Sequence, residues 1–153
     1  MDPRPDIHAA VFDDPDYLDH FVVTVTEPFA SIDDVVHRLA LRQPAWLTRI
    51  SMGISDRDAL ERAVAERGPL GNWAVLDRTD DTVVFGEDMR VMRYRVVYEL
   101  EDPTTLHART EVVQQTRWFG PIYWALATPL HRRFLPRLLR NAGGAGSSVA
   151  ARR

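Results

Sequence analysis

Apolar and polar positions alternate with a period of two in five stretches of the chain, and this period predicts β-strands. The alternating stretches are residues 17–26, 73–77, 82–85, 90–100 and 106–113. Turn residues separate the last four, and Gly86, Glu87 and Asp88 are expected to form one of these turns. The last four strands therefore predict an antiparallel meander with one apolar face.

A period of 3.6 residues predicts helices elsewhere. Ser31 is the expected N-cap of a helix that ends before Pro44, and shorter helices are expected at 45–52 and from Ser55 or Asp56 to about Arg67. The longest helical pattern, residues 118–140, contains two prolines, which predict a kink or break. Its apolar stripe, expected to lie on the sheet, consists of Ile122, Leu126, Leu130, Phe134 and Leu138.

This order of elements predicts an α+β fold of the helix-grip type. In that arrangement a curved antiparallel β-sheet wraps around a long C-terminal helix, and here short helices would lie between the first and second strands. We expect residues 1–16 to form an N-terminal arm, residues 17–141 to form a single helix-grip domain, and residues 142–153 to form a flexible tail, because that tail is rich in Gly, Ala and Ser.

The composition excludes several kinds of functional site and partner. The chain has no cysteine, which excludes disulfides and thiolate metal sites, and all 19 basic side chains are arginine, which excludes a lysine Schiff base. The net charge of −3, with arginines interleaved among 22 acids, argues against nucleic acid as a partner. The longest uncharged run, residues 118–131, is too short to span a membrane. The polar N-terminus has no apolar leader, so we expect a cytoplasmic protein.

Three stretches carry a resemblance to a known family. They are Asp16-Tyr-Leu-Asp-His-Phe21, Gly86-Glu-Asp-Met-Arg-Val-Met-Arg-Tyr-Arg-Val96, and Gly120-Pro-Ile-Tyr-Trp124 with Pro129-Leu-His-Arg132. From about Tyr17 to Asn141 the chain resembles a bacterial family known as domain of unknown function 2867. The resemblance implies a fold similar to the polyketide-cyclase and lipid-transfer superfamily, and it implies no established activity.

The chain keeps some of the residues of that family pattern and departs from others. The retained residues are Gly86, Glu87, Asp88, Arg95, Gly120, Tyr123, Pro129, His131 and Arg132. Val91 and Arg93 stand where the family has His and Asp, and Thr116-Arg117-Trp118 replaces a polar run. These departures suggest that an inherited pocket has been reworked.

Four residues are the candidate catalytic groups. Glu87 or Asp88 could act as a general acid, Arg95 could anchor a carboxylate or polarise a carbonyl, and His131 could act as a general base. The alternative interpretations are a solvated turn for the two acids, cross-strand ion pairs for the arginine, and a surface position for the histidine.

Aromatic residues supply a candidate substrate pocket, and the alternative is a plain hydrophobic core. The candidate substrate-binding residues are Tyr94, Tyr98, Arg93, Trp73, Trp118, Tyr123 and Trp124. The histidines have no metal-ligand spacing and no nucleotide-binding motif occurs, so neither a metal nor a cofactor is expected.

These observations favour a cofactor-free cyclase, isomerase or dehydratase that acts on a polyketide-type metabolite of secondary metabolism by acid–base catalysis in an apolar pocket. The alternative is a non-catalytic module that binds a hydrophobic ligand such as a lipid, or that interacts with another protein. The expected partner is a hydrophobic small molecule, and a homodimer is left open.

Overall fold

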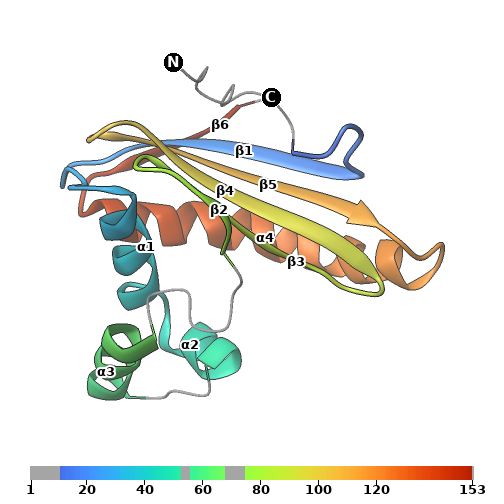
Figure 1. Cartoon of the computed structure of the whole chain (residues 1–153), viewed down its shortest axis with the longest axis horizontal. Helices are drawn as coiled ribbons and strands as arrows, with labels where there is room; N and C mark the ends of the chain where they lie inside the picture. The colour runs from blue at the N-terminus through green and yellow to red at the C-terminus, as the bar shows by residue number, and fades with distance from the viewer. Residues whose placement is uncertain (1–10, 53–55, 68–74, 153) are drawn as a thin grey trace.

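The computed structural model describes residues 11–52, 56–67 and 75–152. Along the chain the elements are β1 (Tyr17–Thr24), α1 (Ile32–Leu41), α2 (Ala45–Met52), α3 (Arg57–Arg67), β2 (Val75–Arg78), β3 (Thr82–Asp88), β4 (Met92–Asp102), β5 (Thr105–Gln114), α4 (Phe119–Gly143) and β6 (Ser148–Arg152). The expected α+β class is confirmed: the strands form one antiparallel sheet, and the long helix α4 runs beneath it (Figure 1).

The sheet has the strand order β2-β3-β4-β5-β1-β6. Strands β2 to β5 form the expected meander, and β1 pairs with β5 from Tyr17↔Val112 to Thr24↔Thr105. The first described strand is therefore held in the sheet by a strand from much later in the chain. Register then fixes the faces: Ala108, Tyr98 and Phe21 all point to the side of α4.

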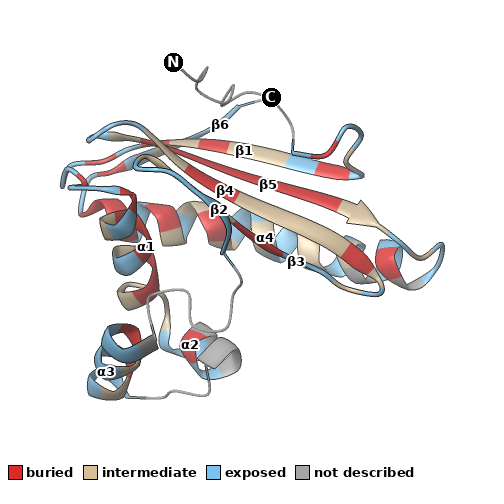
Figure 2. Ribbon diagram, viewed as in Figure 1, coloured by how far each residue is buried: buried red, intermediate tan, exposed pale blue. Residues whose placement is uncertain are grey.

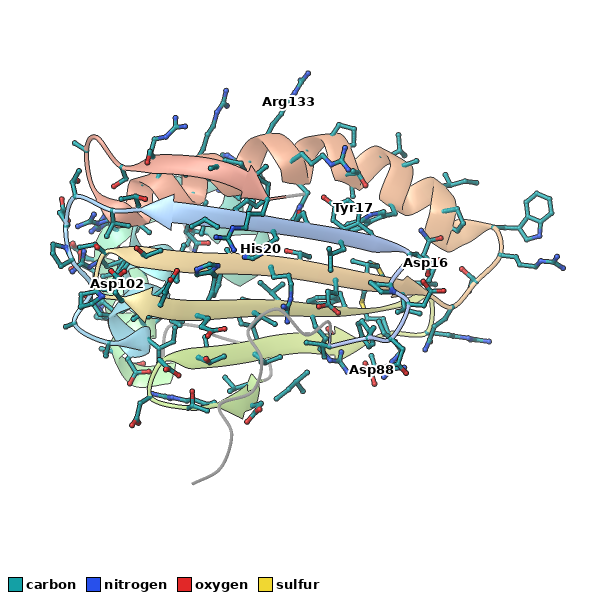
Figure 3. The ribbon with its side chains drawn as sticks, turned by 90° about the horizontal axis from the view of Figure 1, so that it is seen from above. Asp16, Tyr17, His20, Asp88, Asp102 and Arg133 are labelled. Carbon is teal, nitrogen blue, oxygen red and sulfur yellow. The ribbon has the colours of Figure 1, made fainter. Side chains whose placement is uncertain are left out.

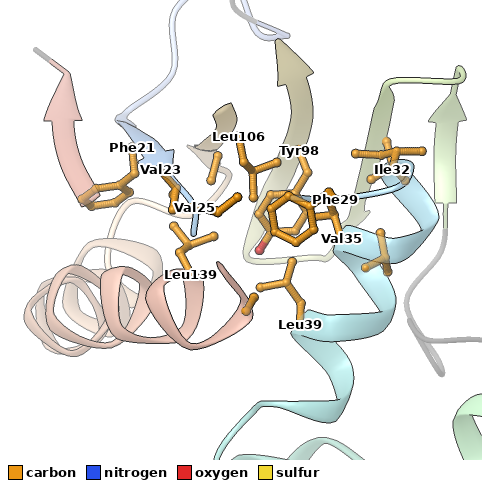
Figure 4. Close-up of a cluster of buried hydrophobic side chains, with 14 of the residues drawn as sticks. Phe21, Val23, Val25, Phe29, Ile32, Val35, Leu39, Tyr98, Leu106 and Leu139 are labelled. Carbon is orange, nitrogen blue, oxygen red and sulfur yellow. The ribbon is translucent and has the colours of Figure 1, made fainter. Parts of the chain in front are cut away.

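The main hydrophobic core lies between the sheet, the second half of α4 and helix α1 (Figure 4). From α4 it takes Leu135, Leu139 and Ala142, and from the sheet it takes Phe21, Val23, Leu106 and Tyr98 among others. The α1 residues expected to face inward, Ile32, Val35, Val36 and Leu39, are all buried there. The predicted N-cap is also confirmed, because the Ser31 hydroxyl accepts the backbone N–H of Asp34.

The expected orientation of α4 is wrong for its first half. Ile122, Leu126 and Leu130 are exposed by 61%, 76% and 59%, so they do not pack on the sheet. The side of the helix that faces the sheet carries Trp124 and, further along, Leu135 and Leu139. Over its first half this face combines Trp124 with the polar His131, so counting apolar residues could not identify it. The helix runs unbroken through Pro129 and Pro136.

Two further expectations are corrected. Gly86, Glu87 and Asp88 are not a turn but the end of β3, and the turn lies at residues 89–91, where the Met89 N–H donates to the carbonyl of Met92. The tail expected at 142–153 is ordered in part, because Ser148–Arg152 forms β6 and pairs with β1. The pairing of β6 covers the otherwise free edge of β1.

The outer face of the sheet, away from α4, is covered in part by residues 11–16 of the expected arm. Phe12 is buried there, and β5 is buried on both faces from Leu106 to Val112 (Figure 2). Helices α2 and α3 lie away from the sheet, below α1 (Figure 1). Among the described residues, no helix combines the length and apolar character that crossing a bilayer requires.

Candidate functional site

The sequence-predicted residues fall on two opposite faces of the sheet. Asp88, Arg93 and Arg95 lie together on the outer face: Asp88 Oδ1 is 2.7 Å from Nη2 of Arg95 and 3.2 Å from Nε of Arg93. Hydrogen bonding from Arg95, the largest influence, holds the pKa of Asp88 below its usual range. Figure 3 looks down on this face and labels Asp88 near the end of its strand.

The arm residues cover this ion cluster. The guanidinium carbons of Arg93 and Arg95 lie 5.0 and 5.2 Å from the centre of the Phe12 ring. The backbone N–H groups of Val11 and Phe12 donate to the two carboxylate oxygens of Glu111, at 2.9 and 2.8 Å. The outer-face charges therefore bind this chain's own arm, which gives them a structural role.

A second outer-face network runs along neighbouring strands. His20 Nε2 lies 2.9 Å from His107 Nδ1, and His107 Nε2 lies 2.8 Å from Oε2 of Glu101. Arg109 Nε lies 2.9 Å from Oε1 of Glu111, which is fully buried. These contacts give the buried polar groups of β5 partners on the outer face of the sheet.

The remaining predicted residues do not form one group. Tyr94, Trp124 and His131 lie on the inner face, where Tyr94 and Trp124 pack against buried Tyr17 and Met92. Tyr98 belongs to the main core beside Phe85, and burial raises its pKa. By register Glu87 shares the inner face but is exposed. Trp118 is 82% exposed. Trp73 and the side chain of Tyr123 lie outside the described part of the structure.

The inner face brings one carboxylate to His131. Asp19, on β1, has Oδ2 3.0 Å from Nδ1 of His131 on α4, and the side chains of the two residues are 9% and 25% exposed. This contact does not have the direction of an aligned hydrogen bond. The Tyr17 hydroxyl donates to the same Oδ2 at 2.8 Å, and the Thr110 N–H donates to Oδ1 at 3.2 Å.

Aromatic rings enclose this pair. The ring of Trp124 lies 4.9 Å from that of Tyr17, edge to face, and 5.9 Å from that of His131. The guanidinium of Arg132 lies 5.6 Å from the Tyr17 ring centre. Burial, the largest influence, raises the pKa of Tyr17 to about 12, so its hydroxyl stays protonated at neutral pH and remains a donor to Asp19.

Besides Nδ1 of His131, two further buried polar atoms at this site have no hydrogen-bond partner among the described residues. They are the hydroxyl oxygen of Thr110, the register partner of Asp19, and the indole nitrogen of Trp124. Leaving such a group unpaired costs about 1–3 kcal/mol. Both atoms could be satisfied by polar groups of a bound molecule, so we define Asp19, His131, Tyr17, Thr110 and Trp124 as the inner-face site.

The inner-face site has the components of acid–base chemistry. A carboxylate beside an imidazole orients the ring and stabilises its protonated form. A tyrosine hydroxyl and an indole N–H provide donors for a ligand oxygen. Within the described ranges, no three His, Asp or Glu side chains are grouped closely enough to hold a metal ion.

Sequence reasoning identified His131 and Trp124 but not Asp19, Tyr17 or Thr110. One observation in the sequence could have indicated Asp19: it alternates with Tyr17, Phe21 and Val23 on the apolar face of its strand. A carboxylate at such a position must find a partner inside the fold. That this partner is His131, more than a hundred positions away, follows only from the fold.

Comparisons with known proteins assign the chain to a family. Neither the curated proteins nor the solved structures yielded a match. The model of one family, described as "Protein of unknown function (DUF2867)", matches residues 11–138. This match includes the arm that covers the outer face and every residue of the inner-face site, and the chain therefore belongs to that family.

Proposed function

We propose that the protein binds an apolar small molecule between the sheet and helix α4, and that Asp19 and His131 act there as a general acid–base pair. The reaction would be a cofactor-free isomerisation or cyclisation of a polyketide-type ketone. Asp88 and Arg95 lie on the opposite face of the sheet, so the proposal gives the acid–base role to Asp19 and His131 instead.

The fold supports a ligand site on this side. A long C-terminal helix along one face of an antiparallel sheet is the arrangement of helix-grip proteins, to which we assign this chain. The space between helix and sheet is where proteins of this architecture can enclose a ligand. In this chain the second half of α4 packs into the core with Leu135 and Leu139, whereas its first half brings Trp124 and His131 to the sheet.

One observation carries the proposal: Asp19 and His131 are 3.0 Å apart at a site where Thr110 Oγ1 and Trp124 Nε1 are buried without a partner. Because Nδ1 is the ring nitrogen that lies beside Asp19, Nε2 is left as the atom that would accept a proton from the ligand. A ligand carbonyl that received hydrogen bonds from Thr110 or Trp124 would have more acidic neighbouring C–H groups, which is the condition for enolisation.

The proposed step balances without an added reagent. His131 takes a proton from the carbon next to a ketone, that C–H bond breaks, and its electron pair forms the enolate. The imidazolium, stabilised by the Asp19 carboxylate, then returns the proton to another carbon of the conjugated system or to the oxygen. Protonation at another carbon gives an isomer, and protonation at the oxygen gives an enol that can cyclise.

The experiment uses 2-tetralone, a bicyclic ketone with acidic C–H groups. The wild-type protein is expected to accelerate the exchange of these protons for deuterium in D₂O, followed by proton NMR. His131→Gln and Asp19→Asn are expected to lower the protein-dependent rate about a hundredfold. His37→Gln changes an exposed histidine on α1 and is the matched control, with an unchanged rate expected.

Binding is measured separately from exchange. A ligand oxygen that accepts the Trp124 N–H would shift its indole NMR resonance, which the Trp124→Phe variant identifies among the four tryptophans. A shift without accelerated exchange would favour the alternative function, a non-catalytic carrier of hydrophobic ligands. Exchange that is equally fast in His131→Gln would contradict the assigned acid–base role.

A further inference from the structure

Helix α4 and its N-cap residue Trp118 carry an apolar stripe on the exposed side of the helix. Trp118, Ile122, Leu126 and Leu130 follow one another at steps of four, with exposures of 82%, 61%, 76% and 59%. Each step of four residues advances about 40° around a helix, so the stripe crosses the side of α4 that is turned away from the sheet. Contiguous exposed apolar surface of this kind marks an interaction site.

Beside this stripe lies a second row of exposed residues spaced by four: Pro121, Ala125 and Pro129. These side chains are short, so a second helix could approach α4 closely there. Rows of side chains at steps of four are the surfaces through which packed helices interdigitate.

A pocket of about 290 Å³ lies at the C-terminal end of the stripe. Leu130 and Phe134 line it together with Trp46 of α2, whose ring lies 5.3 Å from that of Phe134. Arg133 and Arg137 border the same pocket, and Arg133 projects outward from α4 (Figure 3). An apolar pocket bordered by two guanidinium groups suits an aromatic ring, because arginine stacks favourably on aromatic faces.

We propose that a second copy of this chain occupies the stripe. The two α4 helices would pack antiparallel across a two-fold axis level with residue 124, with the stripe of each copy lying against the stripe of the other. Trp118 of each copy would enter the Trp46–Phe134 pocket of the other copy. This inference concerns the outer side of α4 and does not depend on the proposed activity.

The pattern of the stripe favours a second copy over an unrelated partner. A two-fold axis at residue 124 places position 118 opposite 130 and position 122 opposite 126, and all four residues are apolar. The stripe therefore complements its own reversed copy, as an isologous interface requires. The same axis brings the exposed Trp118 of one copy to Leu130, at the edge of the pocket of the other.

The arginines of α4 begin at Arg132 and Arg133, beyond the apolar stripe. In the antiparallel pair, the two Arg133 residues lie roughly 27 Å apart along the helix axes and do not face one another, whereas Arg117 of each copy comes opposite position 131 of the other. Each Arg133 instead lies near Trp118 of the other copy, where a cation–π contact can form.

Sedimentation velocity over a concentration series tests the proposal. The wild-type protein is expected to reach twice the 17.5 kDa mass of the chain at micromolar concentrations. Leu126→Glu places a charge at the centre of the stripe and is expected to give a monomer. Leu126 is already exposed, so the fold is expected to survive, which circular dichroism checks. Leu76→Glu changes an exposed leucine on β2 and is the matched control, expected to remain a dimer.

A second set of variants tests the role of Trp118. Trp118→Ala and Trp46→Ala are each expected to weaken dimerisation about thirtyfold, the effect of losing an interface hot spot. The double variant is expected to dimerise about as strongly as either single variant, because both substitutions remove the same contact. Fully additive effects would contradict the proposed insertion.

The chain has no cysteine, so single cysteines can report the geometry. Leu126→Cys, close to the two-fold axis, is expected to form a disulfide-linked dimer on mild oxidation, whereas Leu18→Cys on β1 is not. A wild-type monomer at all concentrations would overturn the proposal, as would a Leu126→Glu dimer. Binding of a wild-type monomer to phosphatidylglycerol vesicles, lost in Leu126→Glu, would assign the stripe to a membrane surface instead.

Discussion

The Phe12 backbone N–H donates to Oε2 of Glu111 at 2.8 Å, across 99 positions of the chain. Through this bond and its neighbour from Val11, a fully buried carboxylate fixes the arm on the outer face of the sheet. Arg109, 2.9 Å away, balances the charge of Glu111. A glutamate on the outer face of a strand thus becomes part of the interior.

Glu111→Gln is expected to lower the free energy of unfolding by about 3 kcal/mol. The amide keeps one acceptor oxygen, but the second N–H of the arm then faces an NH₂ group and Arg109 loses its balancing charge. Urea denaturation measures the effect. Glu87→Gln, at an exposed position, is the matched control and is expected to change stability by less than about 0.5 kcal/mol.

Gly86→Ala is expected to destabilise the fold by at least about 2 kcal/mol. A Cβ at this position would overlap the backbone carbonyl of Tyr94, so β3 and β4 could not keep their spacing. Gly120→Ala gives the comparison, because its Cβ would meet its nearest neighbours only at 3.3 Å. A change within about 1 kcal/mol is expected there. Equal effects of the two substitutions would contradict the packing argument.

Tyr17 is expected to make stability fall as the pH rises above 10. Its pKa is raised from 10.0 to about 12 in the folded protein, so the phenol of the unfolded chain loses its proton at lower pH. Between pH 10 and about 12, deprotonation therefore favours the unfolded chain over the folded protein. The contribution is fully present below pH 10 and is lost as the pH approaches 12. Tyr17→Phe should show a smaller decline in the denaturation midpoint over this range. An identical decline would place the effect elsewhere, for instance at buried Tyr98.

Deletion of residues 148–153 is expected to destabilise the protein and to promote aggregation. The deletion removes β6, whose pairing with β1 extends from His20↔Arg152 to Thr24↔Ser148. An unpaired strand edge offers free N–H and C=O groups to other chains. Light scattering after mild heating and the denaturation midpoint measure the two effects. A truncated protein as stable and soluble as the full chain would contradict a structural role for β6.

The sequence predicts strands and helix ends correctly where patterns over a few neighbouring residues determine the structure. The alternation around Tyr98 and Ala108 placed the meander and its inner face, and Ser31 marked the start of α1, because strand period and helix capping act over a few residues. The tail was misread for a related reason: its Gly and Ser content is typical of linkers, but the edge of β1 gives residues 148–152 a partner.

The candidate site was harder to predict, because it depends on which face of α4 meets the sheet. The regular spacing of Ile122, Leu126 and Leu130 indicated an inner face, yet these residues are exposed, and His131 reaches Asp19 from another side of the helix. Period alone cannot separate a stripe that packs on its own sheet from one that remains exposed. Arg93 and Arg95 were likewise assigned to a pocket, whereas register places them beneath the arm.

The position of β1 between β5 and β6 also constrains how the chain is made. During synthesis β1 leaves the ribosome early, but both strands that pair with it are translated at least 80 residues later. Phe21 and Val23 of the growing chain therefore stay exposed, and prone to aggregation, until β5 has been synthesised. Such non-local pairing also slows folding. Nascent chains that end before residue 105 are expected to need chaperone protection, whereas the meander of β2 to β5 can form as soon as it is synthesised.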